Sequence, residues 1–469
     1  MGTRAGFCRS GRFMGMLLVI LSVSFFIFGT FRNVPYKIES DGKYYYQYLI
    51  SIFFDGDLDF NNNYRAPAYV WMESEVDHYR LRESLHPVTQ RPVNPFSSGP
   101  AVLWSLPFLL LYGLGRLLVN LGATWPDLNP WSRYFQYGVM YAGVLYCIAG
   151  LCLTHSLLRR WVEERVARAS LVLVLFASSL FYYTVFEVSM SHVYDFFTMA
   201  LFVVTYVRCR EAPVIKALPR HFVAGLAAGL HVLVRPQNFA TVAIFFLFLA
   251  LGSRRDGWRP ALARPGVFAL GLGIAMVPML AANHALRGSV FANTHGSSFF
   301  RPLAPHLVDT LFSSRNGLFF FHPVLLFGLL GAVLAWWHAR HDGGGWKPVL
   351  APLLLSFAAQ WFINSIAVDW WAGASFGLRR FVSSNLVFAM GLAWLLQQLQ
   401  DRWPGLSKGL TKRLVAYPVV LNLYLTLLYV FDYTWAYGEP KNVFALMFWD
   451  APVRGFWLVH TFLRSVGLG

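Results

Sequence analysis

An acidic stretch that runs directly into tyrosines begins at Glu39. It contains Asp41, an Asp-Gly step with Gly42, and then Tyr44 and Tyr45. A carboxylate can accept the proton of a reacting hydroxyl group, and tyrosines suit a membrane interface or a bound substrate. An isolated Asp-Gly step is also typical of a solvated turn, so both interpretations of Asp41 depend on its surroundings.

A second group of ionisable residues lies in the segment 187–195. Glu187, His192 and Asp195 belong to it. Ionisable groups inside a membrane cost about 2.5–3.5 kcal/mol on insertion scales, so they usually line a cavity or pair with each other. These three residues are therefore expected to line a cavity, with a structural pair as the alternative.

Arginines and tryptophans supply groups that a phosphorylated sugar would need. Arg235 precedes a proline, and Trp370, Trp371, Arg379 and Arg380 share one short segment. Guanidinium groups bind phosphate through paired hydrogen bonds, and indole rings can stack on sugars. Snorkelling of Arg235 to an interface and an interfacial aromatic belt are the competing interpretations.

Three further carboxylates stand at alternate positions, Asp55, Asp57 and Asp59. The spacing resembles that of calcium-binding loops, whose ligands are oxygen atoms. We expect ordinary loop residues here first, and the sequence leaves the use of a divalent metal ion undecided.

The composition is that of a membrane protein. Of 469 residues, 56% are hydrophobic and 13% are charged, whereas soluble domains have about 25% charged residues. A net charge of +16 would suggest a nucleic-acid partner in a soluble protein. In a membrane protein the basic residues mark orientation instead, so no nucleic acid is expected.

Nine stretches of at least 18 residues contain no Asp, Glu, Lys or Arg. Each is long enough to cross a hydrocarbon core of about 30 Å as a helix. They are 13–31, 134–158, 169–186, 236–253, 265–286, 316–339, 348–368, 381–400 and 414–431. Continuous apolar runs lack the alternation of barrel strands, so the expected fold class is all-α. The first run is expected to be an uncleaved anchor.

The basic residues set the expected topology. Three arginines precede the first run, which predicts a cytoplasmic amino terminus and a large external loop at 32–132. The segment 101–114 is apolar for only 14 residues, contains Pro107 and is followed by Arg116. We expect it to be an interfacial helix that does not cross. The later basic loops then alternate correctly, and about eleven spans result.

Two regions complete the expected domain organisation. The Arg235-Pro step should break the helix between 221–234 and 236–253, and two spans or one re-entrant hairpin give the same topology. Residues 1–432 then form one transmembrane domain, and 433–469 form an external or interfacial tail. All four cysteines fall in cytoplasmic or spanning segments, where disulfides are not expected.

Several short motifs resemble those of the GT-C superfamily of polytopic glycosyltransferases. The resemblance is nearest to the bacterial branch that is similar to protein mannosyltransferases and lipid A aminoarabinose transferases. The matching pieces follow the family's order along most of the chain: Asp41 with Tyr44 and Tyr45, residues 94–100 leading into 101–114, the hairpin at 187–195, the helix that ends at Arg235, residues 313–320, and the segment from Trp371 to Arg379.

The resemblance implies an inverting transfer of a sugar from a polyprenyl-phosphate donor. By position, it implies that Asp41 is the general base. Glu187, His192 and Asp195 compete for the family's second acidic position. A lipid-borne donor agrees with the absence of any nucleotide-binding fingerprint from the sequence.

The remaining candidates bind substrate in this interpretation. They are Arg235, Arg379 and Arg380 for the lipid phosphate, and Tyr44, Tyr45, Trp370 and Trp371 for the sugar. The expected partners are the lipid-linked donor, a glycan, lipid or protein acceptor, and membrane lipids. The expected location is a bacterial inner membrane, with the site facing the periplasm or exterior.

Two alternatives to an enzyme stay open. One is a transporter or flippase of a lipid-linked saccharide, and the other is a sugar-binding membrane protein without catalysis. A transporter predicts ionisable residues near the bilayer midplane, whereas the ionisable residues here cluster at the expected outer ends of helices.

Overall fold

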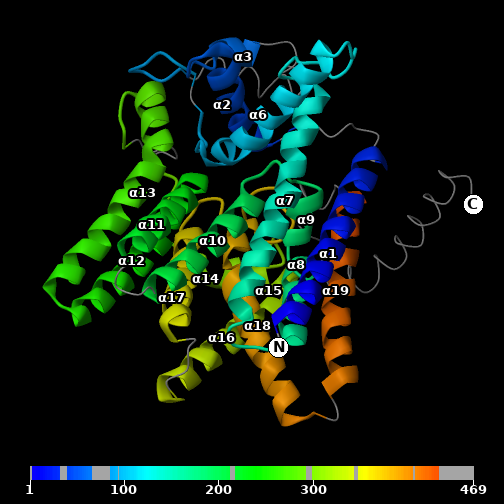
Figure 1. The fold of residues 1–469 in the computed structure, drawn as a ribbon, viewed down its shortest axis with the longest axis vertical. Coiled ribbons are helices and arrows are strands. Elements are labelled where there is room, and N and C mark those ends of the chain that lie inside the picture. The colour runs from blue at the N-terminus through cyan, green and yellow to red at the C-terminus, as the bar shows by residue number, and fades with distance from the viewer. Residues whose placement is uncertain are drawn as a thin grey trace, which may run out of the picture. The chain divides into compact units, whose positions relative to one another are not determined.

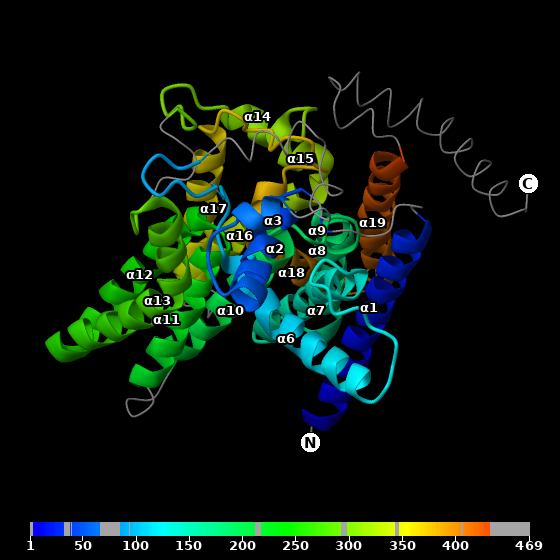
Figure 2. The ribbon, with the colours of Figure 1, turned by 90° about the horizontal axis from the view of Figure 1, so that it is seen from above.

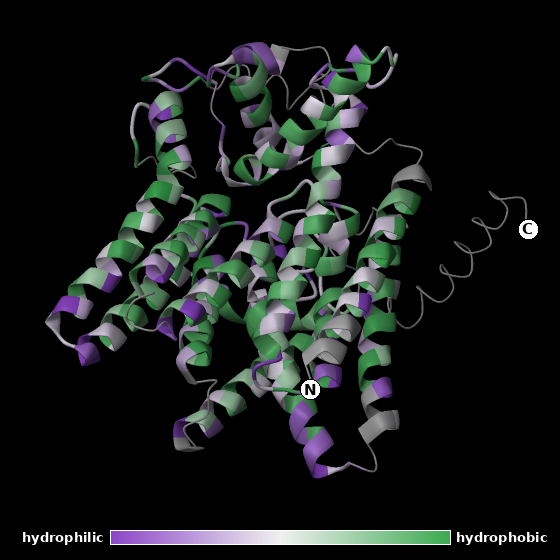
Figure 3. Ribbon diagram, in the orientation of Figure 1, coloured by the Kyte–Doolittle hydropathy of each residue, from purple (hydrophilic) through white to green (hydrophobic). Residues whose placement is uncertain are grey.

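The computed structural model describes residues 3–31, 38, 40–65, 85–92, 94–211, 217–291, 298–342, 347–404 and 407–431. These residues form helices joined by turns and loops, and the all-α polytopic membrane fold expected from the sequence is confirmed. Hydrophobic residues run along the helices, and hydrophilic residues gather towards their ends and connections (Figure 3). The predicted tail at 433–469 lies outside the described residues, as does Glu39.

The chain divides into two compact units, and the first contains the two acidic stretches. It comprises Met1–Trp161, Tyr183–Phe299 and Trp346–Gln360. Its elements (Figure 1) are α1 (Thr3–Phe31), α2 (Gly42–Ile50), the π-helix η1 (Ser51–Asp55), α3 (Asn61–Arg65), α6 (Gly99–Asn120), α7 (Arg133–Leu158), α10 (His192–Arg210), α11 (Ala217–Val234), η3 (Pro236–Asn238), α12 (Phe239–Ser253), η4 (Arg254–Asp256) and α13 (Trp258–Arg287).

The second unit comprises Val162–Tyr182, Phe300–Gly345 and Trp361–Gly469. Its described elements are α8 (Glu164–Phe176), α14 (Leu307–Phe312), α15 (Leu318–Phe321), α16 (Pro323–Asp342), η5 (Arg379–Ser384), α18 (Asn385–Arg402) and α19 (Ser407–Phe431). Two helices, α9 (Leu180–Val185) and α17 (Lys347–Ser365), contribute residues to both units.

Close packing fixes α11, the helix that leads to the Arg235-Pro step. A Cβ atom on Gly225 would lie 2.1 Å from the carbonyl oxygen of Phe268 in α13, and one on Gly271 would lie 2.4 Å from that of Phe222. Small residues allow helices in a membrane to approach each other this closely. The crossing therefore holds α11 in place against α13.

Helix α6 is longer than the apolar segment 101–114, for which the sequence predicts an interfacial or re-entrant helix. The helix continues through Pro107 to Asn120. Proline removes the hydrogen bond that the carbonyl four residues earlier would accept. That carbonyl, on Leu103, instead accepts a hydrogen bond from Tyr146 Oη at 2.7 Å. The helix keeps its course because a neighbouring helix satisfies the group that proline leaves free.

The first large loop builds a cap on one end of the first unit. Helices α2, α3 and α6 lie together at the end of the unit where α7 begins (Figure 1), and α6 extends across the view from above (Figure 2). Helices α6 and α7 pack in opposite directions, because Leu103 contacts Tyr146 whereas Leu111 accepts a hydrogen bond from Tyr134 at 2.8 Å.

Ten helices of the described chain are long and apolar enough to cross a membrane, and they include α6, α11 and α12. The predicted break between α11 and α12 is confirmed, since Arg235 is extended at φ −144° and ψ 111°. The predicted run 169–186 is interrupted where α8 ends. There Asn422 Nδ2 donates to the carbonyls of Phe176 and Ser178, both at 2.9 Å.

The length of α6 makes the topology a sharp test. If α6 does not cross, a reporter fused near Asn62 is external and one fused near Glu163 is cytoplasmic, because the basic loops then follow the positive-inside rule. A paired phosphatase and fluorescent-protein fusion at each position measures this. An external signal near Glu163 would show that α6 crosses and would move every later loop to the opposite side.

Candidate functional site

Asp41 lies directly before α2 and is held beside the segment 187–195. Ser40 adopts a left-handed conformation, φ +53°, where the chain turns into α2. A Cβ atom on Gly42 would lie 2.5 Å from Ser189 Cβ and 2.9 Å from the backbone oxygen of the same residue. Only glycine permits this approach, so the Asp-Gly step brings the two acidic stretches of the sequence together.

The carboxylate of Asp41 is half-buried at this junction. It occupies the N-cap position of α2 but makes no capping hydrogen bond, and no other described residue donates one to it. Its oxygen atoms can therefore accept a hydrogen bond from a bound molecule. A partly buried carboxylate in that state has the properties of a general base.

The loop before α6 braces α2 against the end of α11. Asn94 Nδ2 donates to the carbonyl of Tyr44 at 2.9 Å, and the rings of Tyr44 and Phe96 lie 5.0 Å apart. At the other end of the loop, a Cβ atom on Gly99 would lie 2.2 Å from the carbonyl oxygen of Leu233. The loop therefore fixes the start of α2 relative to the end of α11.

The two predicted tyrosines differ in their surroundings. Tyr45 is 3% exposed, and its ring packs against Phe96 and Trp104 at 5.6 and 6.3 Å. Tyr44 is half-buried. Of the two, Tyr44 is therefore the residue better placed to contact a bound molecule.

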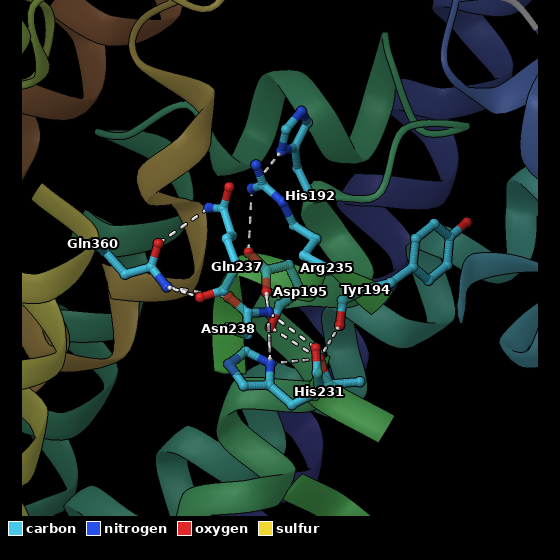
Figure 4. A network of polar contacts seen from close by, with 9 residues as sticks. His192, Tyr194, Asp195, His231, Arg235, Gln237, Asn238 and Gln360 are labelled. Carbon is cyan, nitrogen blue, oxygen red and sulfur yellow. Dashed lines mark hydrogen bonds and ion pairs between the residues drawn. The ribbon is translucent and has the colours of Figure 1, made fainter. Parts of the chain in front are cut away.

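Asp195 is the centre of a buried polar network (Figure 4). Its side chain is 0% exposed, and its Oδ2 lies 3.4 Å from Arg235 Nη1. Its Oδ1 accepts a hydrogen bond from Asn238 Nδ2 at 2.6 Å and lies 3.6 Å from His231 Nδ1. Thr198 Oγ1 and His231 Nδ1 are 3.0 Å apart. Both carboxylate oxygens of Asp195 are engaged, as expected for a structural ion pair.

Arg235 connects this network to the hairpin before α10. Its Nη1 lies 3.5 Å from His192 Nδ1 as well as 3.4 Å from Asp195. No described residue accepts a hydrogen bond from its Nε or Nη2, and its side chain is 13% exposed. One edge of the guanidinium group is therefore anchored, and the other is open to a ligand.

Two glutamine side chains, one from η3 and one from α17, lie beside the network and are hydrogen-bonded to each other. Gln237 Nε2 donates to Gln360 Oε1 at 3.1 Å, and Gln360 Nε2 donates to the carbonyl of Gln237 at 3.2 Å. Gln360 Nε2 also lies 3.5 Å from Asn238 Oδ1 (Figure 4). These bonds orient Asn238 towards the carboxylate of Asp195.

The other two predicted catalytic residues lie in the hairpin itself. His192 is buried, and its ring lies 4.6 Å from that of Tyr183. Glu187 is half-buried, and its carbonyl accepts a hydrogen bond from the amide of Met190 at 3.1 Å. Glu187 thus stands two residues before Ser189, the residue that touches the start of α2.

The remaining predicted binding residues belong to the second unit. Arg380 Nη2 lies 2.6 Å from Asp369 Oδ2, so its charge already has a partner. Arg379 begins η5 and is half-buried. Trp370 and Trp371 are adjacent rings, 5.8 Å apart at 87°. Their predicted grouping with the arginine of the first unit stays a prediction.

The three alternating aspartates stabilise their own loop. Ser51 Oγ donates to Asp57 Oδ1 at 2.8 Å, Asn63 Nδ2 donates to Asp55 Oδ2 at 2.7 Å, and Asp59 accepts a backbone amide at 3.0 Å. In the part of the chain that the structure describes, no three His, Cys, Asp or Glu side chains group in a way that could hold a metal ion.

Solved structures of an archaeal oligosaccharyltransferase are similar to this chain. They are the Archaeoglobus fulgidus oligosaccharyltransferase in the apo form (13% identity, TM-score 0.45), the same protein with Zn and sulfate (14%, 0.42), and AglB from that organism with an inhibitory peptide and a dolichol-phosphate (13%, 0.43). The alignments cover 92, 87 and 87% of this chain but 57, 50 and 53% of those chains. This chain thus spans about half of their length. No protein-family model and no curated protein matches the sequence.

Five residues of the network were not predicted from the sequence, namely Thr198, His231, Gln237, Asn238 and Gln360. His231 precedes Arg235 by four residues and Asn238 follows it by three, so a search within one turn of Arg235 would have found both. Gln360 has no local signal, because it reaches the network from α17.

The ion pair predicts a specific pattern of stability. We expect Asp195→Asn and Arg235→Gln each to lower the free energy of unfolding by about 3–5 kcal/mol, because each leaves a buried charge unpaired. The double variant removes both charges, so its loss should be smaller than the sum by about 1–3 kcal/mol. The free energy of unfolding is measured in one detergent and buffer for the wild type, the two single variants and the double variant.

An exposed ion pair of the same unit is the matched control. Arg264 pairs with Asp256, whose side chain is 54% exposed, and Asp256→Asn should cost less than about 1 kcal/mol. Additive losses in the two single variants of the buried pair would show that the contact between Asp195 and Arg235 is not what stabilises the network.

Proposed function

We propose that this protein is a glycosyltransferase of the GT-C type, which moves a sugar from a polyprenyl-phosphate donor to an acceptor at the external face of the membrane. The observation that carries the proposal is the presence of two complementary groups in one unit, each beside the segment 187–195. Asp41 offers a carboxylate with open oxygen atoms, and Arg235 offers an anchored guanidinium group with an open edge. The motif resemblance supports the same reaction.

Asp41 is the general base in this mechanism. It accepts the proton of the acceptor hydroxyl as that oxygen bonds to the anomeric carbon of the sugar. The bond from the anomeric carbon to the phosphate oxygen breaks on the opposite face, so the configuration inverts. Asp195 is a weaker candidate for the base, because it is 0% exposed and both its oxygen atoms already have partners.

Arg235 stabilises the departing lipid phosphate. Negative charge accumulates on the phosphate as the glycosidic bond lengthens, and donors that are already oriented stabilise it without reorganisation. Asp195 and His192 hold Nη1, which leaves Nε and Nη2 as a fork for two phosphate oxygens. Arg379 and Arg380 remain proposed phosphate ligands from the second unit.

The mechanism has no step through a metal ion. The steps above use only side chains of the protein, and among the residues that the structure describes no three His, Cys, Asp or Glu side chains group in a way that could hold a metal ion. The basic loops support a cytoplasmic amino terminus, and the resemblance to a bacterial branch supports a bacterial inner membrane as the location. The site then faces the periplasm.

A deletion strain tests the proposed function as a whole. Mass spectrometry of its cell-surface glycans and glycolipids should show the loss of one sugar from a defined species, together with accumulation of the acceptor that lacks it. Complementation with the wild-type gene should restore the sugar. An unchanged set of glycans and glycolipids would refute a transferase, and accumulation of a complete lipid-linked saccharide would favour a transporter.

The base assignment predicts the behaviour of Asp41→Asn. The amide keeps the shape of the side chain but cannot accept the proton, so transfer should fall to background while folding is retained. Complementation of the deletion strain measures the loss. Asp55→Asn, which alters an exposed carboxylate in the same loop, is the control and should complement fully. Near-normal transfer by Asp41→Asn would move the search for the base to Glu187.

The phosphate role predicts a graded series at Arg235. Arg235→Ala should slow transfer about 100- to 1000-fold, as is usual when a preorganised donor is lost. Arg235→Lys should recover only part of the rate, because an ammonium group cannot bind phosphate bidentately. Single-turnover rates at saturating donor in lipid nanodiscs measure both variants.

Folding must be separated from chemistry in this series, because Arg235 also pairs with Asp195. Arg235→Lys keeps the positive charge, so its unfolding midpoint should stay near that of the wild type while its rate falls. Arg116→Ala removes an exposed arginine of α6 and should change neither quantity. A full rate in Arg235→Lys would mean that the fork does not bind phosphate.

A further inference from the structure

The tryptophan pair of the second unit is covered by cationic or titratable side chains. Arg315 Cζ lies 3.9 Å from the ring centroid of Trp371. The ring of His306 stacks on Trp370 with centroids 5.5 Å apart and an interplanar angle of 23°. A sugar needs an open indole face for stacking, so the face of Trp371 beneath Arg315 is not a sugar platform. The group that this stack presents to solvent is the guanidinium of Arg315.

Rigid loops hold the stack in place. Asn316 Nδ2 donates to the carbonyl of Trp371 at 2.8 Å and to Ser375 Oγ at 3.1 Å. Asn316 and Gly373 both adopt left-handed conformations, at φ +65° and +68°. The residue after Arg315 is thus bonded directly to the loop that carries Trp371. Arg315 is oriented before any ligand arrives.

The hydrogen-bonding capacity of Arg315 is open. Its side chain is exposed, and no described residue accepts a hydrogen bond from its guanidinium group. The carboxylates of the same two loops are engaged elsewhere, because Asp309 lies 3.0 Å from His306 Nδ1 and Asp369 lies 2.6 Å from Arg380 Nη2. No described carboxylate of these two segments therefore compensates the positive charge that the stack presents.

We propose that Arg315, stacked on Trp371, is a binding subsite for the phosphate or carboxylate group of an acidic sugar. A stacked guanidinium group keeps its plane fixed and directs its N–H edge outwards, which matches two oxygens of one anionic group. The indole face also attracts the cation through its π electrons. The assignment of the acidic sugar to the acceptor rests on the proposed function. The binding of an acidic sugar to Arg315 does not depend on that function.

Saturation-transfer NMR on the whole protein in phosphatidylcholine nanodiscs tests the subsite. The probes are glucose 6-phosphate and glucuronate, with glucose as the neutral reference. Both acidic sugars should bind more tightly than glucose. Arg315→Gln should weaken their binding about tenfold or more, because a charge-assisted pair of hydrogen bonds is lost. Arg315→Lys and Trp371→Leu should each weaken it partially.

Arg301→Gln is the matched control. Arg301 is an exposed arginine of the same loop for which no aromatic stack is described, and its loss should leave binding unchanged. Equal binding of glucose and glucose 6-phosphate, or equal effects of Arg301→Gln and Arg315→Gln, would overturn the subsite.

A third arm distinguishes the source of the anion. In nanodiscs that contain phosphatidylglycerol, glucose 6-phosphate should still bind if the subsite takes a sugar. Loss of its binding there would assign Arg315 to a lipid headgroup and overturn the sugar assignment. The binding assay involves no transfer, so its failure would leave the proposed reaction standing, and failure of the deletion-strain test would leave the binding result standing.

Discussion

The buried contact between Asp195 and Arg235 organises the candidate site. A carboxylate with 0% exposure is tolerated only when its charge and its lone pairs are satisfied. Arg235 and Asn238 satisfy them from the helix break, and Asp195 itself lies in the first turn of α10. The same contact therefore joins α10, α11 and η3, and it orients the arginine that faces the ligand.

Two close backbone contacts position Asp41 relative to this network. Gly42 packs on Ser189 in the hairpin before α10, and Gly99 packs on Leu233 at the end of α11. Larger side chains at these glycines would push α2 or α6 away from the elements that the ion pair joins. The contacts of Gly42 and Gly99 thus attach α2 and α6 to the helices on either side of the network. The carboxylate of Asp41 is therefore positioned by packing rather than by its own hydrogen bonds.

The sequence predicted the fold class and the helix break, because both depend on local chemistry. Charge-free runs identify spans, and the Arg235-Pro step removes the hydrogen bond on which a continuous helix depends. The expected helix over 101–114 already contained Pro107, but the sequence did not reveal that Tyr146, in another helix, satisfies the carbonyl that the proline leaves free. The interruption after α8 was missed for the same reason, since Asn422 supplies the donor from α19.

In the candidate site too, the residue types could be predicted from the sequence, whereas their contacts could not. Asp41, Asp195 and Arg235 were recognisable as residue types, but their roles differ because of contacts made at a distance in the sequence. Asp195 and Asp41 are both carboxylates beside the same hairpin. Only the partners that the fold brings to Asp195 distinguish a structural anion from a candidate base. The sequence shows which chemical groups are present. Whether each carboxylate has a hydrogen-bond partner depends on the fold, which brings Asn238 to Asp195 and holds Asp41 in place through the glycine contacts.

The ion pair of Arg235 with Asp195 also bears on whether the protein is a transporter or a glycosyltransferase. If Arg235 binds the phosphate as proposed, Asp195 lowers the net attraction for a phosphate that is already charged, and its contact fixes the direction of the other guanidinium edge. An arginine held in this way gains most when further negative charge develops on the oxygens in front of it, because no reorganisation is needed at that moment. Such a site binds the transition state more strongly than the intact donor, which accelerates a reaction. A carrier needs the opposite property, since the same saccharide must be bound and then released unchanged.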